Sequence, residues 1–195
     1  MSRETGYPSK TFLIWSAANA LWFGVLGLIS LSSPHLPWIP AWIVTALLLS
    51  LPVSLVQWIG LRWLFPISPI WVLSVPAGVL LWEILLFRVN LFWFWQNDES
   101  IAALTIPYLL LGLLIGLLQW LILRRRFSGS SLWLLGSTIG AGGGLWLILV
   151  TDLIDQSGFL AAIVAVLVYI VATGGILTWL LSSQAKSQSG ATSAA

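Results

Sequence analysis

The stretch IAALTIPYLLLGLLIGLLQWLIL, residues 101–123, decides the fold class, because it is long, apolar and free of charged side chains. A helix needs about 20 consecutive apolar residues to cross the hydrocarbon core of a bilayer. This stretch has that length, and it ends directly before Arg124, Arg125 and Arg126. Clustered basic residues are typical of the point where a helix leaves the membrane on the cytoplasmic side. The sequence therefore predicts a transmembrane helix here.

The whole chain has the composition of an integral membrane protein. Of its 195 residues, 59% are hydrophobic and only 7% are charged, whereas a soluble domain carries roughly 25% charged residues. A soluble protein of this size could not hide so much apolar surface from water. The net charge of +2 is interpreted as orienting the chain in the membrane, and no nucleic-acid partner is expected. These numbers predict an all-α integral membrane protein in contact with the lipid bilayer.

Five further apolar runs resemble the first, and breaks with Pro, polar residues or charges separate them. The six predicted spans cover about residues 11–31, 41–61, 69–89, 101–123, 131–150 and 158–181. Residues 1–10 then form an N-terminal tail. Residues 182–195 are mostly Ser, Ala, Gln and Gly, so the sequence predicts a disordered C-terminal tail.

The basic residues predict the orientation of these spans. With six crossings, one side of the membrane receives Arg3, Lys10, Arg62, Arg124, Arg125, Arg126 and Lys186. The other side receives Asp98, Glu99, Asp152 and Asp155, with Arg88 near a helix end. Lys and Arg concentrate on cytoplasmic loops. Both termini are therefore expected in the cytoplasm, in a bacterial inner membrane or an internal, thylakoid-type membrane.

An internal repeat organises the chain. The segment LVQWIGLR, residues 55–62, recurs as LLQWLILR, residues 117–124. The match continues at a constant offset, because Phe65, Ser68, Trp71, Leu73 and Gly78 recur as Phe127, Ser130, Trp133, Leu135 and Gly140. A weaker third copy, GILTWL at 175–180, has Thr178 in place of the glutamine. The pattern predicts three tandem helix hairpins within a single domain, residues 11–181.

This Gln-Trp-x-x-Leu-Arg hairpin repeat resembles a loose group of small bacterial, often cyanobacterial, polytopic membrane proteins. The resemblance covers roughly residues 11–181. It implies the hairpin fold and implies no particular activity, substrate or cofactor.

Five polar side chains within or beside the predicted spans are candidates for an intramembrane site: Glu83, Arg88, Asn19, Gln57 and Gln119. Glu83 lies in the outer half of the third span, and an ionisable group there points to function by default. The alternative is a structural role, in which Glu83 anchors a helix and the glutamines bond to neighbouring helices. Both interpretations stay open at this stage.

Two further groups of residues have expected roles at the membrane. Arg62, Arg124, Arg125 and Arg126 are candidates for contact with anionic lipid headgroups. Trp15, Trp71 and Trp133 each open a span, so we expect them in the aromatic belt at the membrane surface. Glycines on a helix permit close packing in lipid. This predicts helix contacts, within the chain or in a homo-oligomer, at Gly112, Gly116, Gly136, Gly140 and Gly144.

The residue types argue against catalysis. The chain has no Cys and a single His, which excludes thiolate nucleophiles and multi-histidine zinc or haem sites. The segment from Glu83 to Arg88 is similar to the first motif of the CAAX-protease family, but Ile84 stands where that motif has a second Glu, and the later His motifs are missing. No enzyme activity, metal or cofactor is expected.

The function expected from these features is a non-enzymatic scaffold, anchor or assembly module of a membrane complex, whose partners are other membrane proteins or further copies of itself. Two alternatives remain open. One is a small transporter or channel with Glu83 in its path, and the other is a lipid- or pigment-binding membrane protein.

Overall fold

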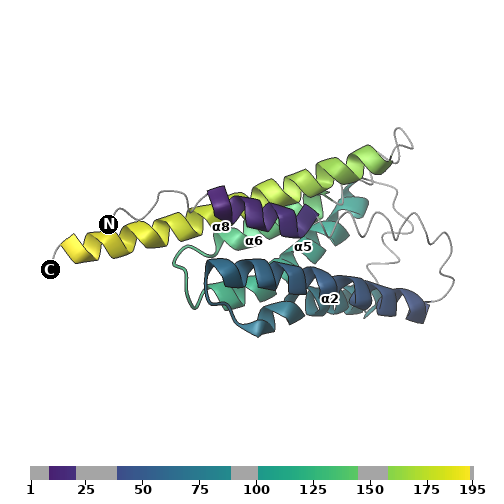
Figure 1. Ribbon diagram of the computed structural model, residues 1–195. Coiled ribbons are helices and arrows are strands. Elements are labelled where there is room, and N and C mark those ends of the chain that lie inside the picture. The colour runs from purple at the N-terminus through teal and green to yellow at the C-terminus, as the bar shows by residue number, and fades with distance from the viewer. Residues whose placement is uncertain (1–8, 21–38, 89–100, 145–157, 194–195) are drawn as a thin grey trace.

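The computed structural model describes residues 9–20, 39–88, 101–144 and 158–193, and nearly all of them are helical. The first helix covers residues 9–20. The elements that follow are α2 (Ile39–Leu64), the 3-10 helix η1 (Pro69–Leu73), α3 (Ser74–Arg88), α5 (Ile101–Leu123), α6 (Leu132–Ser137), the π-helix η2 (Thr138–Gly143) and α8 (Gly158–Ser193). They form an elongated bundle whose longest member, α8, extends past one end (Figure 1).

Three segments of the described chain are long and apolar enough to cross a membrane. They are Pro69–Leu86, Thr105–Leu123 and Ile163–Gln184, with mean hydropathies of 1.8, 2.2 and 2.3. Many of their large apolar side chains face outward, as lipid-facing helices require. The predicted second span, 41–61, lies within the continuous helix α2. The first and fifth predicted spans lie partly outside the described residues.

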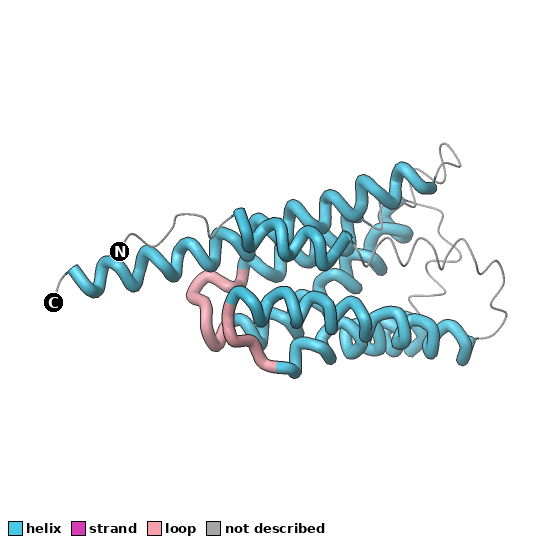
Figure 2. Tube along the Cα trace, viewed as in Figure 1, coloured by secondary structure: helices cyan, strands magenta, loops and turns pink. Residues whose placement is uncertain are grey.

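Both described turns lie at the same end of the bundle (Figure 2). One joins α2 to η1 and the other joins α5 to α6. They share two backbone hydrogen bonds at matched positions: Phe65 N and Phe127 N each donate to a leucine carbonyl at 2.9 Å, and the Trp71 and Trp133 amides donate to serine carbonyls at 3.1 and 2.9 Å. Similar local sequences therefore fold into turns with similar backbone bonding.

The second turn contains the one glycine that needs a left-handed backbone in the described chain. Gly129 has φ of 79°, a conformation that other residues adopt only at a cost. A Cβ placed there would also lie 3.1 Å from the ring of Trp179 on α8. The turn can therefore lie close against α8 because position 129 is glycine.

The five glycines predicted to mark helix contacts all lie at close contacts within the chain. A Cβ on Gly112 would lie 2.7 Å from the carbonyl oxygen of Ser137 and 3.0 Å from Gly142 N. Gly116 also lies against Ser137, whereas Gly136, Gly140 and Gly144 lie against α8. In lipid, such close approach is a main source of helix association. Elements α6 and η2 are thus packed tightly between α5 and α8.

The helical backbone differs from the sequence-based expectation in the fifth predicted span. Its first part is α6, but Thr138–Gly143 forms a π-helix. The side chain of Thr138 bonds to the carbonyl of Leu134 at 2.7 Å, and such back-bonding competes with regular helix hydrogen bonds. The run of glycines that follows lowers the intrinsic helix preference. Periodicity alone could not predict this local widening.

Two other features also differ from expectation. Residues 182–193 were expected to be disordered, whereas α8 continues through them to Ser193. This extension contains no proline to stop a helix that the preceding apolar segment has already started. A proline inside a span is expected to kink its helix, but Pro76 lies in the first turn of α3, where helices tolerate the missing N–H. Pro52 and Pro107 lie inside α2 and α5.

Candidate functional site: a buried polar network

Three tryptophans form the centre of the core. Trp15, Trp71 and Trp133 are each at most 1% exposed. Trp133 makes edge-to-face contacts with both others, with ring centroids 5.6 Å from Trp15 and 5.9 Å from Trp71. Buried leucines and the edge-to-face pair Phe65 and Phe127 surround them. Aromatic pairs in this geometry add to the stability that burial alone supplies.

The expectation that these tryptophans belong to an interfacial belt is wrong. An indole is stable at the membrane surface because its N–H needs a polar partner. Here two of the three indoles find that partner inside the bundle. Trp15 Nε1 donates to Thr173 Oγ1, and Trp133 Nε1 donates to Gln119 Oε1, each at 2.9 Å. An internal partner removes the need to reach the headgroups.

The glutamines bond to one another and to the first helix. Gln57 Nε2 donates to Asn19 Oδ1 at 2.7 Å, and Gln119 Nε2 lies 3.5 Å from Gln57 Oε1. Asn19 Nδ2 in turn donates to the carbonyl of Trp15 at 2.8 Å. All three amide side chains are at most 1% exposed. The sequence-predicted candidates Asn19, Gln57 and Gln119 are therefore brought together.

Helix α8 contributes two members that the sequence did not single out. Tyr169 Oη accepts a hydrogen bond from Gln57 Nε2 at 3.3 Å, and Thr173 Oγ1 donates to the Tyr169 carbonyl at 2.6 Å. The network thus joins helix 9–20, α2, α5, α6 and α8. The only earlier signal on α8 was Thr178, but that residue is half-buried and bonds to Gly174 of its own helix at 2.8 Å. Thr173 takes the interior position.

The chemistry of this network favours positioning over reaction. Amides, an indole and hydroxyls neither ionise readily nor act as strong nucleophiles without an activating base. Among the described residues, no group of three His, Cys, Asp or Glu side chains could hold a metal ion. Beside the network, the Nε1 donor of buried Trp71 has no hydrogen-bond partner. The network is suited to fixing how the helices meet.

Glu83 lies apart from the network. It is 4% exposed on α3, and its Oε2 atom has no hydrogen-bond partner. Asn19, which the sequence grouped with Glu83 as a candidate for one site, bonds to Gln57 and Trp15 instead. Arg88 ends α3, and its side chain lies outside the described part of the chain. Near Glu83, Trp82 Nε1 donates to the Pro107 carbonyl at 2.7 Å and joins α3 to α5.

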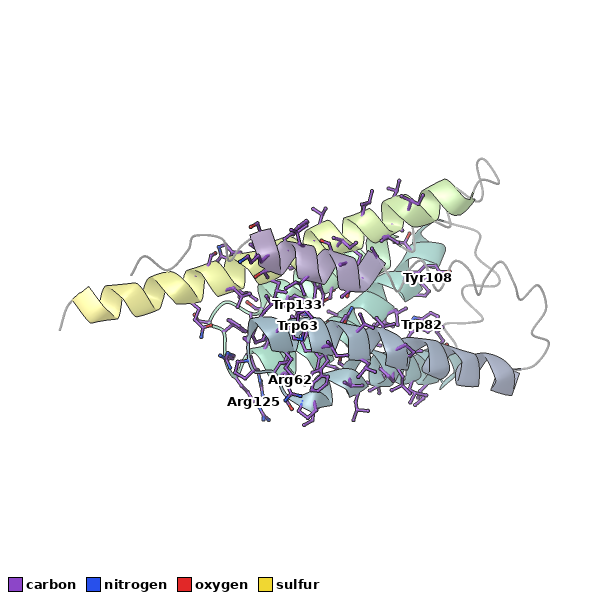
Figure 3. All side chains as sticks on the ribbon, viewed as in Figure 1. Arg62, Trp63, Trp82, Tyr108, Arg125 and Trp133 are labelled. Atoms are coloured by element: carbon purple, nitrogen blue, oxygen red, sulfur yellow. The ribbon has the colours of Figure 1, made fainter. Side chains whose placement is uncertain are left out.

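The four arginines predicted to contact lipid lie at the end of the bundle that holds the two described turns, and Figure 3 shows Arg62 and Arg125 there. Arg62 lies 5.1 Å from the ring centre of Trp58, and Arg124 lies 5.1 Å from that of Trp120. Arg126 lies over Phe65 at 5.6 Å and donates to the Pro66 carbonyl at 3.0 Å. Three of the four candidate lipid contacts are therefore held by aromatic rings.

A scan against protein-family models finds no match for this chain, and neither do searches of the curated proteins and of the solved structures.

Proposed function

We propose that the chain crosses a bacterial membrane six times, as three tandem helix hairpins with both termini in the cytoplasm. Support comes from the matched positions of the two full sequence copies. Gln57 and Gln119 meet in the core, Phe65 contacts Phe127, and Trp71 contacts Trp133. Arg62 and Arg124 stack on equivalent tryptophans. Equivalent residues that meet around one centre are what a bundle of repeated hairpins would produce.

The first and last helices of the bundle are joined by a hydrogen bond of a similar kind. Trp133 on α6 bonds to Gln119 on the preceding helix α5, and Trp15 on the first helix bonds to Thr173 on the last helix, α8. Gly174 of α8 lies against Trp15 and Phe12. The first hairpin then follows the third around a pseudo-threefold axis. In this arrangement Thr173 replaces glutamine, and Leu177 is equivalent to Leu61 and Leu123, all three fully buried.

The function that this geometry supports best is a non-enzymatic membrane module that anchors or scaffolds a larger complex. The observation that supports this proposal is that the buried amides bond to one another and to an indole. Polar groups that could line a transport path are instead bonded between helices, which holds the helices in place. The bundle also has extensive exposed apolar surface, on which Trp63 is 77% exposed. Other membrane proteins could bind to this surface.

The scaffold proposal is tested by the mass of the purified particle. The chain is extracted from its own membrane in a mild detergent and measured by light scattering, with the detergent subtracted. We expect a particle heavier than one chain, in which the bound partner or further copy is present in a constant ratio to the chain. Trp63→Ala removes the most exposed aromatic ring of the described residues and should weaken the association. A particle with the mass of a single chain in every mild detergent would contradict the proposal.

One observation favours a second candidate, a small transporter or channel. Glu83 is a buried carboxyl group with an unpartnered oxygen, and intramembrane ionisable groups often mark proton or ion paths. Proteoliposomes that contain the wild-type chain would then show a cation or proton flux that Glu83→Gln abolishes. Equal flux in wild-type and Glu83→Gln vesicles, at the level of empty vesicles, would eliminate this candidate.

A further inference from the structure

A pocket of about 520 Å³ opens between the two described turns, beside η1, the start of α3 and the end of α5. Its walls are mostly apolar and include Ile70, Leu73, Ala77 and Leu121. Ile70 and Leu73 are 61% and 58% exposed, so the pocket is open on the side where apolar side chains face outward. Its only charged lining residues are Arg125 and Arg126. One cavity therefore combines an apolar wall with positive charge.

The two arginines at this pocket are in different states. Arg126 already stacks on Phe65 and donates to the Pro66 carbonyl. Arg125 is exposed and, within the described part of the chain, has no hydrogen bond, ion pair or ring contact. An arginine without a partner has five N–H donors in a planar fork that fits the oxygens of a phosphate. No acidic residue lines the pocket to compete for that fork.

We propose that this pocket binds a phospholipid with an anionic headgroup. One acyl chain would lie along Leu73, Ala77 and Leu121, and the phosphate would meet the Arg125 guanidinium. The occupant has to be amphipathic, because the apolar wall needs hydrocarbon and the arginine needs an anion. A bilayer lipid supplies both in one molecule, at the depth where a helix end meets the headgroups. The arginine expected to select the lipid is thus Arg125, rather than the whole group of four.

Lipid retention in native mass spectrometry tests the proposal. The full-length chain is titrated in detergent with phosphatidylglycerol or with phosphatidylcholine, and the lipid-bound fraction gives an apparent Kd for each. One basic residue near anionic lipid is worth about 1 kcal/mol, or about fivefold in Kd. We therefore expect wild type to prefer phosphatidylglycerol by at least about fivefold, and Arg125→Gln to lose most of that preference.

Arg124→Gln is the matched control, because it removes the same charge from the neighbouring residue, whose guanidinium lies over Trp120 and does not line the pocket. It should keep the preference. Ala77→Phe fills the wall and should weaken the binding of both lipids. Equal losses of the phosphatidylglycerol preference in Arg124→Gln and Arg125→Gln would mean that the preference comes from the overall surface charge and not from the pocket. That result, unchanged binding in Ala77→Phe, or displacement of the lipid by inorganic phosphate alone, would overturn the proposal.

Discussion

Gln119 shows how one amide can fix the approach of several helices in a bundle. Its carbonyl oxygen accepts from Trp133 on α6, while its amide nitrogen faces Gln57 on α2. The side chain is fully buried, so water cannot reach its amide group and only protein groups can bond to it. Leaving a buried donor without an acceptor costs about 1–3 kcal/mol. A residue of this kind limits how the helices can slide or rotate.

The bond between Gln119 and Trp133 can be isolated by a double-mutant cycle of Gln119→Leu and Trp133→Phe. Hydrogen bonds between membrane helices are worth about 0.6–1.7 kcal/mol, and we expect a coupling free energy of unfolding in that range. The measurement is reversible denaturant unfolding in mixed micelles. The parallel cycle of Gln119→Leu with Trp71→Phe is the control. Trp71 Nε1 has no partner, so its coupling should be near zero, and equal coupling in both cycles would contradict the assigned bond.

Part of this site could be predicted from the sequence. Gln57 and Gln119 could be singled out because a polar residue recurs at equivalent positions of two apolar segments. Trp15 and Trp133 were placed at the membrane surface, since a tryptophan at the start of a span looks the same whether its N–H meets a headgroup or a buried amide. Tyr169 and Thr173 could not be found, because the third copy is too weak to set its register. Only tertiary contacts distinguish Thr173 from Thr178.

At the scale of the elements, α5 and the pair α6 and η2 depend on glycine for their contact. The atoms that would meet a Cβ on Gly112 belong to the backbone of Ser137, Thr138 and Gly142. Backbone cannot rotate away as a side chain can, so the helices would have to separate. Such separation would also draw Gln119 away from Trp133, because both residues lie on these elements.

Gly112→Ala is therefore expected to lower the free energy of unfolding by about 1–3 kcal/mol, as overpacking does in well-packed cores. Gly175→Ala is the matched control, because a Cβ on Gly175 would meet nothing within 4 Å. It should leave stability unchanged or raise it by up to about 1 kcal/mol through helix preference. Thermal unfolding of both variants in detergent gives the comparison. Equal destabilisation of the two would show that the contact between α5 and η2 is not as close as described.

The existence of the helices was predictable from the length of their apolar runs, but two local features were not. The π-helix at Thr138–Gly143 depends on a side-chain bond to Leu134 and on packing between α5 and α8, neither of which leaves a periodic signal. The continuation of α8 to Ser193 follows from propagation of an existing helix. Composition alone, read without the preceding helix, indicates disorder.

At the scale of the whole molecule, the proposed topology concentrates positive charge at one end of an apolar bundle. The turn that carries Arg124, Arg125 and Arg126 lies at that end (Figure 2). The proposed lipid site depends on this placement, since Arg125 can meet headgroups only at a membrane surface. The proposed pseudo-threefold closure, with Trp15 against Thr173, makes the first and last helices neighbours. An even number of crossings then leaves both chain ends on the cytoplasmic side.

The most direct test of this topology uses single cysteines, because the natural chain has none. Ser68→Cys and Ser128→Cys label the two described turns, where both serines are exposed. Ser2→Cys labels the N-terminal tail, and Asn97→Cys labels the segment proposed to face outward. In intact cells, a membrane-impermeant maleimide should react only at position 97, and the other three should react after permeabilisation. Labelling of position 68 or of position 128 in intact cells would contradict the proposed six-span arrangement, whether one of the two reacts or both do.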